Sequence, residues 1–277
     1  MKTITMAPAL LCAGAMLAAS GGAAARQPEA PNALLARATA MYGTLKSYAD
    51  AGRVLREAPG IRDRARFETY YRRETLDFYF EHQWLTSENP KSPGLKIDLT
   101  RQRRVLWMRN GELRAFSQEL GSLQTYPRDG GNQTGALTGT SAATAGTSTL
   151  IPSLLFAKSN LPGTLRQIRE AAEAGFENVD GHRCHKIDGV AAEFYPSGAR
   201  TNVRPVTVWL DAETMLIRKV FEDTPKGYMA GSYSRLTVTL DPQANSPLDD
   251  SRFEFVPPTR SQSGRQAQLS TAFQSSR

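Results

Sequence analysis

Apolar and polar residues alternate along most of the chain, and this alternation predicts β-structure. The segment "VTVWLDAETMLIRKVFED" at 206–223 has two apolar-rich arms around a polar centre at 211–214. A period of two on each arm, with a short polar break between the arms, is typical of a β-hairpin. On the second arm we expect Ile217 and Phe221 to face the same way, with Lys219 between them.

Further strands follow from the same period of two. Phe78, Phe80, His82 and Trp84 alternate with polar or amphipathic residues and should share one face. Asn110-Gly111 indicates a tight turn, because both residues tolerate positive φ, and we expect a break near Gly121. Strand-like segments lie at 48–57, 65–72, 76–84, 95–99, 104–108, 113–126, 176–179, 182–188, 191–195, 233–240 and 253–256.

Helical spacing occurs at three places. Apolar residues three and four apart predict a helix over 32–46, and "IPSLLFA" starts a short helix at 152–157. Thr164 to Gln167 fits a capping box, and Leu165, Ile168 and Ala172 form a stripe, which predicts an amphipathic helix over 164–174. The fold class is therefore mainly β with helices, of the α+β type. We expect one antiparallel sheet of about ten or eleven strands, curled so that helices cover its concave side.

The two ends and one internal segment differ from the rest. Residues 1–25 have a basic start, an apolar run and an Ala-x-Ala ending, which is the layout of a cleaved signal peptide. Residues 128–149 read as a flexible polar loop, and 259–277 as a disordered tail. A single domain then covers 26–258. No later apolar run is long enough to span a bilayer, so we expect an exported protein that is not integral to the membrane.

Charge and cysteine content limit the kinds of partner and of covalent cross-link that we expect. The formal net charge is +7, and the arginines form local groups such as Arg62–Arg66 and Arg101–Arg104. Such groups suit a solvated β-face, an anionic lipid surface or an acidic partner, and for an exported protein we expect no nucleic acid. Cys184 is the single cysteine after residue 25, so the mature chain has no internal disulfide.

The sequence contains few patterns that indicate a metal site or a catalytic site. His182, Cys184 and His185 invite a zinc interpretation, but an extended strand would point His185 away from the other two. A strand with Cys184 as a small core residue is the simpler interpretation. The sequence has no Gly-x-Ser-x-Gly elbow and no phosphate-binding loop. We therefore expect no catalytic residues, no metal, no cofactor and no enzymatic activity.

Four short segments, which follow one another along the chain, resemble those of a known family. The helix ending in "LKSY", the turn "RNGELRAF", the hairpin "VWLDAETMLIRKV" and the terminal "FEFVPP" resemble the LolA/LolB-like superfamily of outer-membrane lipoprotein carriers. "GFENVDGHRCHKID" resembles a poorly characterised periplasmic branch of it. The resemblance implies an incomplete antiparallel barrel with helices across its mouth, a hydrophobic cavity between them, and a lipid or lipoprotein acyl chain as the guest.

The candidate site is the apolar concave face under a helical cover. Its expected lid is the 164–174 helix, with Leu165, Ile168 and Ala172 as the docking stripe. The alternatives are a permanent dry core with a fixed helix, or a cell-envelope module that uses the same scaffold to grip a protein partner. The expected cavity residues are Phe78, Phe80, Trp84, Val105, Trp107, Val206, Val208, Leu210, Leu236, Val238 and Leu240.

Overall fold

A computed structural model describes residues 29–126, 154–156, 165, 168–194, 200–224 and 234–258. The expected signal peptide at 1–25, the loop at 128–149 and the tail at 259–277 lie outside these residues. Within them, no helix combines the length and apolar character that crossing a membrane requires.

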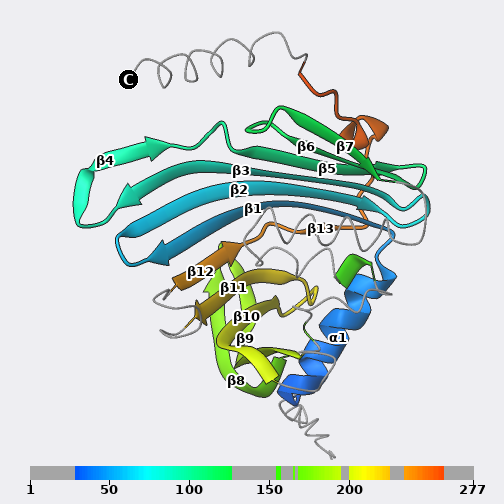
Figure 1. Ribbon diagram of the computed structural model, residues 1–277. Helices are drawn as coiled ribbons and strands as arrows, with labels where there is room; N and C mark the ends of the chain where they lie inside the picture. The colour runs from blue at the N-terminus through cyan, green and yellow to red at the C-terminus, as the bar shows by residue number, and fades with distance from the viewer. Residues whose placement is uncertain are drawn as a thin grey trace, which may run out of the picture.

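One antiparallel sheet contains every described strand (Figure 1). The strand order is β7-β6-β5-β3-β2-β1-β12-β11-β10-β9-β8, and β4 and β13 pair with β3 and β1 off this path. The strands are β1 (Ser47–Ala58), β2 (Ile61–Arg72), β3 (Asp77–Asn89), β4 (Ser92–Asp98), β5 (Arg103–Arg109), β6 (Glu112–Ser117), β7 (Ser122–Tyr126), β8 (Ile168–Val179), β9 (His182–Phe194), β10 (Arg200–Asp211), β11 (Ile217–Thr224), β12 (Ser234–Thr239) and β13 (Gln243–Ala244).

The sheet is open and bends over on itself. In Figure 1, β8 to β11 run at a steep angle to β1, β2 and β3, and the helix α1 (Pro31–Thr44) lies beside them. α1 buries Leu34, Leu35, Ala38 and Tyr42 in the main apolar cluster, together with side chains from one face of most strands. This confirms the expected class, an open antiparallel half-barrel with a helix over its concave face.

Close approach between strands depends on one glycine in β1. Gly52 lies directly opposite Phe67 on β2. A Cβ added at Gly52 would come within 2.0 Å of the Phe67 ring, so the ring covers the glycine backbone. This arrangement places the large Phe67 side chain on the concave face without displacing β1.

The predicted 164–174 helix is wrong, because residues 168–179 form the edge strand β8. Two register shifts interrupt its pairing with β9, and Glu170 and Gly175 have positive φ. These bulges break the period of two and leave a spacing that mimics a helix. Pairing with β9 then overrides the local helical preference, and Ile168 packs 2.5 Å from the ideal Cβ position of Gly189.

Two other expectations also fail locally. Phe253 ends the short 3-10 helix η2 (Asp250–Phe253), and residues 254–256 pair with no described strand. In the hairpin, a bulge between Trp209 and Leu210 shifts the register. Ile217 therefore lies in the main cluster, whereas Phe221 packs with Trp209 on the other face.

Two glycine substitutions should have opposite effects on stability. Gly52→Ala should lower the free energy of unfolding by about 1–3 kcal/mol, because the new methyl group collides with the Phe67 ring. Gly43→Ala in α1 meets no atom within 4 Å and should raise it by about 0.5 kcal/mol through helix propensity. Urea unfolding curves measure both changes. Equal effects of the two substitutions would contradict this account of Gly52.

Candidate functional site

The concave face collects nine of the eleven expected cavity residues. Eight belong to one apolar cluster with α1, and Trp84 packs against that cluster. They come from three separate parts of the chain, which the sheet order brings together. The nine residues are Phe78, Phe80, Trp84, Val206, Val208, Leu210, Leu236, Val238 and Leu240.

An uninterrupted apolar row crosses this face. Each member lies directly opposite the next on the neighbouring strand, from β9 to β3. Six strand spacings of ~4.8 Å give the row a length of roughly 29 Å along the sheet. In order, it contains Ile187, Val208, Val220, Val238, Val54, Ala65 and Trp84.

Val105 and Trp107 are not part of this face. They pair with Glu81 and Tyr79 on β3, whereas Leu106 and Met108 pair with Phe80 and Phe78. Directly opposed residues share a face, so Leu106 and Met108 point inward and Val105 and Trp107 outward. The four consecutive residues at 105–108 are all apolar. Odd-numbered and even-numbered positions therefore look alike, and the sequence cannot indicate which of them point inward.

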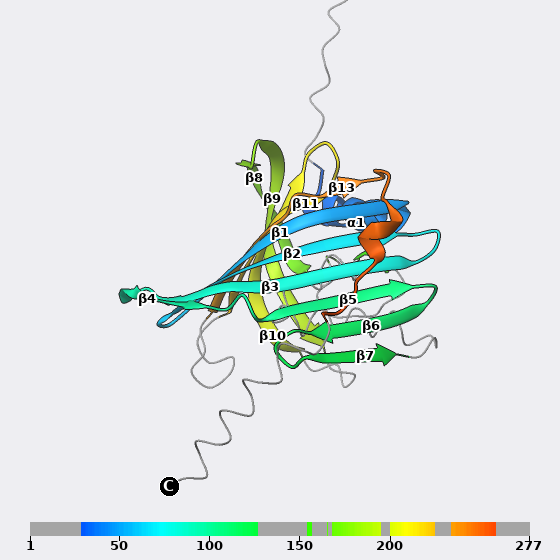
Figure 2. The same ribbon diagram turned by 90° about the horizontal axis from the view of Figure 1, so that it is seen from above.

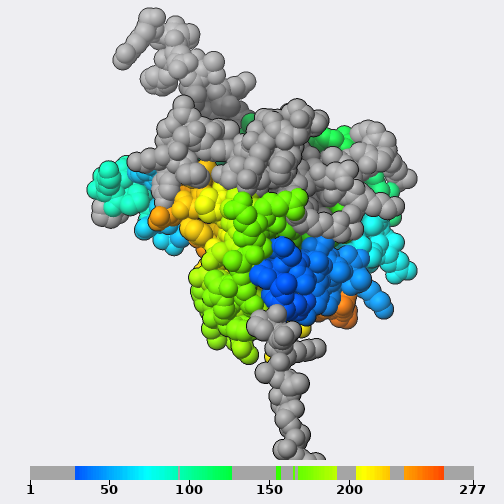
Figure 3. All heavy atoms as spheres, turned by 90° about the horizontal axis from the view of Figure 1, so that it is seen from below, coloured from blue at the N-terminus to red at the C-terminus, as the bar shows by residue number. Residues whose placement is uncertain are grey.

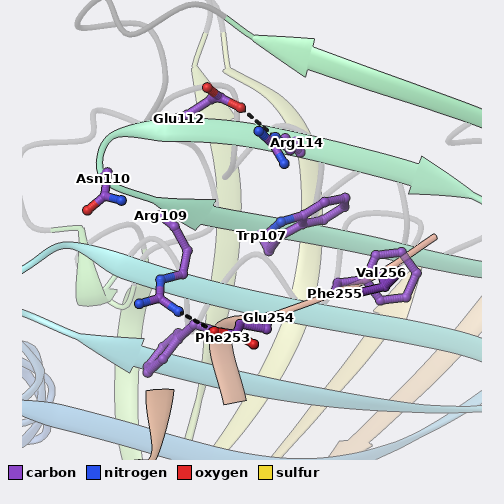
Figure 4. A pocket seen from close by; sticks show the side chains of 9 residues that line it. All are labelled: Trp107, Arg109, Asn110, Glu112, Arg114, Phe253, Glu254, Phe255 and Val256. Atoms are coloured by element: carbon purple, nitrogen blue, oxygen red, sulfur yellow. Dashed lines mark hydrogen bonds and ion pairs between the residues drawn. The ribbon is translucent and has the colours of Figure 1, made fainter. Parts of the chain in front are cut away.

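The outer face has its own apolar cluster under the C-terminal segment. Val105, Trp107, Tyr79, Phe116 and Phe253 form it, and Figure 2 shows η2 over the outer side of the β1–β3 region. A pocket of about 360 Å³ opens beside the segment, as Figure 4 shows. Its lining residues are Trp107, Arg109, Asn110, Glu112, Arg114, Phe253, Glu254, Phe255 and Val256.

Ion pairs fix the C-terminal segment to this outer face. Asp250 accepts a hydrogen bond from Arg72 at 2.8 Å, and Glu254 lies 3.3 Å from Arg109. Asp77 lies between both arginines. In the arginine groups seen in the sequence, Arg62 and Arg64 pair with Glu88 and Arg103 pairs with Glu81, in agreement with a solvated β-face.

The expected lid residues have separate positions. Leu165 and Ile168 are buried in the main cluster, but Ala172 is exposed on β8. These three residues do not form one docking stripe. The described helical cover of the concave face is α1, which Figure 3 shows against β8 at the surface, together with a helical turn at 154–156 that lies within the predicted 152–157 helix.

Arg73, which the sequence pattern does not single out, holds α1 in place. Its Nε donates to the carbonyl oxygen of Leu45 at 2.6 Å and its Nη2 to that of Tyr42 at 2.8 Å. Nη2 also lies 3.5 Å from the carbonyl oxygen of Leu155. A cation at the C-terminus of a helix satisfies its last carbonyls and its dipole. The Arg73 side chain, directly after the end of β2, therefore joins α1 and residues 154–156 to the sheet.

Within the described ranges, several polar side-chain atoms are buried on the concave face without a hydrogen-bond partner. They are Tyr48 Oη, Asp50 Oδ2, Tyr71 Oη and both ring nitrogens of His82. Burial raises the pKa of Asp50 to about 7, although its other oxygen accepts a hydrogen bond from the Asp241 amide. Burial likewise lowers the pKa of His82 to about 4, so its imidazole is neutral near pH 7.

The histidine–cysteine cluster does not converge. His182 lies 3.2 Å from Asp211, and His185 lies 2.8 Å from Glu173. Cys184 is buried beside Trp209, and burial raises the pKa of its thiol to about 11. Across the described residues, no group of three or more potential ligands is placed to hold a metal ion.

A second pocket lies at the junction of β1 and β12. Its volume is about 510 Å³, and Arg218 at its wall is hydrogen-bonded to Asp211 and Asp241. The Asp211–Arg218–Asp241 chain continues to Asp50 through the Asp241 amide. Arg218 lies at the bulge in β11, and this network supplies hydrogen-bond acceptors to its guanidinium. The arrangement favours a structural role for Arg218.

Comparisons with known proteins give similarity at the level of the fold. No family model matches the sequence, and no curated protein does. Solved structures with similar architecture include lipoprotein LppX from Mycobacterium tuberculosis, with a TM-score of 0.43 and 15% identity over 79% of this chain and 99% of that chain. They also include MucB in complex with MucA, with a TM-score of 0.39 and 12% identity over 82% and 61% of the two chains.

A LolA superfamily protein from Nitrosomonas europaea is also similar, with a TM-score of 0.29 and 9% identity over 82% of this chain and 98% of that chain. It carries the name of the superfamily that the sequence phrases resemble. At such low identity and TM-score, these likenesses assign neither a ligand nor a partner to this chain.

Removing the Arg73 guanidinium should loosen the helical cover. Arg73→Gln should lower the free energy of unfolding by about 2 kcal/mol, because charge-assisted bonds to the Leu45 and Tyr42 carbonyls are lost. Arg53→Gln is the matched control, since Arg53 forms an exposed pair with Asp180 and should cost less than ~0.5 kcal/mol. Thermal unfolding with a helix-sensitive signal measures both. Similar losses from the two variants would contradict the anchoring role.

Asp50 and His82 should oppose each other in the pH dependence of stability. Unfolded Asp ionises near pH ~3.9, whereas folded Asp50 keeps its proton up to about pH 7. Its contribution to stability therefore falls as pH rises from ~4 to 7. Unfolded His binds a proton below pH ~6.5, whereas folded His82 stays neutral down to about pH 4, so its contribution falls as pH drops through that window.

Single substitutions should separate the two slopes. Between pH 4.5 and 6.5, Asp50→Asn should make stability rise with pH more steeply than in the wild type, and His82→Leu should make it fall with pH, each by roughly 1 kcal/mol per pH unit. Urea unfolding at three pH values in this window measures the slopes. Identical slopes in all three proteins would show that these two groups do not titrate as their burial implies.

Proposed function

We propose that this protein is a non-enzymatic, periplasmic binding protein that holds an acyl chain or another hydrophobic ligand against the concave face of its sheet. The observation that carries the proposal is the uninterrupted apolar row from Ile187 to Trp84, which crosses seven strands. The amino-terminal signal-peptide pattern supports export of the protein.

The energetics of this face favour an apolar guest. Each buried methylene group contributes ~0.8 kcal/mol, so a dozen would contribute roughly 10 kcal/mol before the costs of association. The hydrocarbon core of a bilayer is ~30 Å thick, so a single lipid chain spans about 15 Å. The row is longer than this, and one chain can lie along it.

A ligand can reach the concave face only if α1 moves away from it. α1 has no side-chain hydrogen bond at its N-cap and is held by Arg73 near its C-terminus and by Tyr42, whose Oη accepts from the Ile217 amide at 3.0 Å. The N-terminal part of α1 is held by burial of Leu34, Leu35 and Ala38 in the main apolar cluster, a contact that an apolar ligand can replace. In this proposal the ligand takes the place of the apolar side of α1, and α1 closes again after release.

A polar group placed in the row should weaken binding selectively. Val238→Thr keeps the side-chain shape but buries a hydroxyl group, which should raise the Kd for a dansylated undecanoic acid about 5–30-fold, from a cost of ~1–2 kcal/mol. Thr237→Val on the other face of the same strand is the matched control and should leave Kd unchanged. The change in dansyl fluorescence reports binding.

Two results would count against the proposal. One is the failure of wild-type protein to bind this probe, together with the absence of lipid from organic extracts of the purified protein. The other is an equal loss of affinity in Val238→Thr and Thr237→Val, which would place the probe elsewhere.

A protein-interaction role in the cell envelope is the second candidate. The observation that favours it is a set of exposed apolar side chains on β4 and around β7, namely Leu95, Ile97, Leu120 and Leu123. Exposed apolar residues on projecting or edge strands are suited to protein contacts. Absence of lipid binding, with a protein partner lost on Leu95→Ser and Ile97→Ser substitution, would favour this candidate.

A further inference from the structure

The apolar row ends beside two polar residues of the same face, His82 and Arg104, and we call this part of the face the corner. Trp84, the last member of the row, contacts the His82 ring edge-on, with ring centroids 5.1 Å apart and an interplanar angle of 82°. His82 is 1% exposed, and neither of its nitrogens has a hydrogen-bond partner among the residues that the structure describes. Burying both nitrogens without partners is costly, so this residue needs an explanation that the apolar row does not supply.

An arginine lies directly opposite this histidine. Arg104 on β5 pairs with His82 on β3, so both side chains project from the same face of the sheet. Arg104 is exposed, and it has no ion-pair or hydrogen-bond partner in the part of the chain that the structure describes. This contrasts with Arg72, Arg103 and Arg109, which have acidic partners on the outer face.

The other charges near the corner cancel. Arg56 lies over the Trp84 ring at 5.1 Å and is paired with the buried carboxylate of Asp63. Glu81 is on the outer face, where it binds Arg103 at 2.7 Å. Ser117, opposite Arg104 on β6, adds a neutral hydroxyl group. Counting the described residues alone, the corner therefore has one uncompensated positive charge, at Arg104.

We propose that this corner is a head-group site, and that the ligand of the concave face is an anionic amphiphile. Its carboxylate or phosphate head binds the Arg104 guanidinium and the His82 imidazole, and its chain runs from Trp84 along the apolar row toward Ile187. The inference rests on the proposed function, because it assigns a direction and a chemical class to the ligand of that same face. A neutral imidazole can donate one hydrogen bond to the head, and guanidinium matches either anion bidentately.

Displacement of Nile red, an uncharged apolar dye, tests the head-group site with matched ligands. Palmitate and hexadecanol have the same chain and differ in head charge. Arg104→Gln should raise the palmitate concentration for half-displacement about 10-fold or more, because a charge-assisted contact is lost, and change that of hexadecanol by less than ~2-fold. Arg64→Gln, on the outer face of β2, is the control and should change neither.

Substitution of His82 supplies a second readout. His82→Leu removes two unpartnered buried nitrogens, so it should raise the melting temperature while weakening palmitate binding several-fold. A purely structural histidine would give no loss of palmitate affinity. An unchanged or lower melting temperature with unchanged palmitate affinity would overturn its role in the site.

Further ligands distinguish a carboxylate head from a phosphate head. They also distinguish failure of the head-group site from failure of the proposed function. Hexadecyl phosphate displacing more strongly than palmitate would support the phosphate form of the head, and the reverse would support the carboxylate form. Inorganic phosphate or acetate displacing the dye without a chain would overturn the amphiphile. If palmitate and hexadecanol both displace the dye and Arg104→Gln affects them equally, the head-group site is wrong and the hydrophobic site stands. If neither displaces it from the wild type, the proposed function itself fails.

Discussion

The pairing of β1 with β12 is the contact on which the rest of the structure depends. These strands lie almost at opposite ends of the described chain, and five residue pairs from Arg53–Thr239 to Glu57–Arg235 join them. Through this seam two groups of strands become one sheet. Val54 and Val238 meet there, which makes the apolar row continuous. A long closed loop is expensive in entropy, and burial of the shared concave face offsets that cost.

The two faces of the sheet are built on different physical principles. On the outer face, arginines alternate with carboxylates, and the C-terminal segment is tied down through Asp250, Glu254 and the buried Phe253 ring. The inner face is apolar, is covered by α1, and contains polar atoms that have no hydrogen-bond partner among the described residues. Ion pairs and hydrogen bonds hold the outer face together, whereas apolar burial holds the inner face together.

Local chemistry predicted much of the β-structure and most of the residues that share the concave face. Phe78 and Phe80, like Val206 and Val208, alternate with outward residues, so their common face could be inferred before any strand was placed. Bulges defeated the same reasoning in β8, where Glu170 and Gly175 adopt positive φ, and beside Leu210. The anchoring by Arg73 could not be inferred, because its partners are backbone carbonyls, which no sequence pattern marks.

The sequence by itself determined the fold class, the turns at Asn110 and Gly121, and the separation of His182 from His185, because periodicity and turn chemistry are local properties. Only the tertiary structure decided which face of the 105–108 run points inward, since all four residues are apolar and register with β3 makes the choice. It also decided that Arg104 lies opposite His82. Residues 22 positions apart meet only through strand pairing, which depends on the whole sheet.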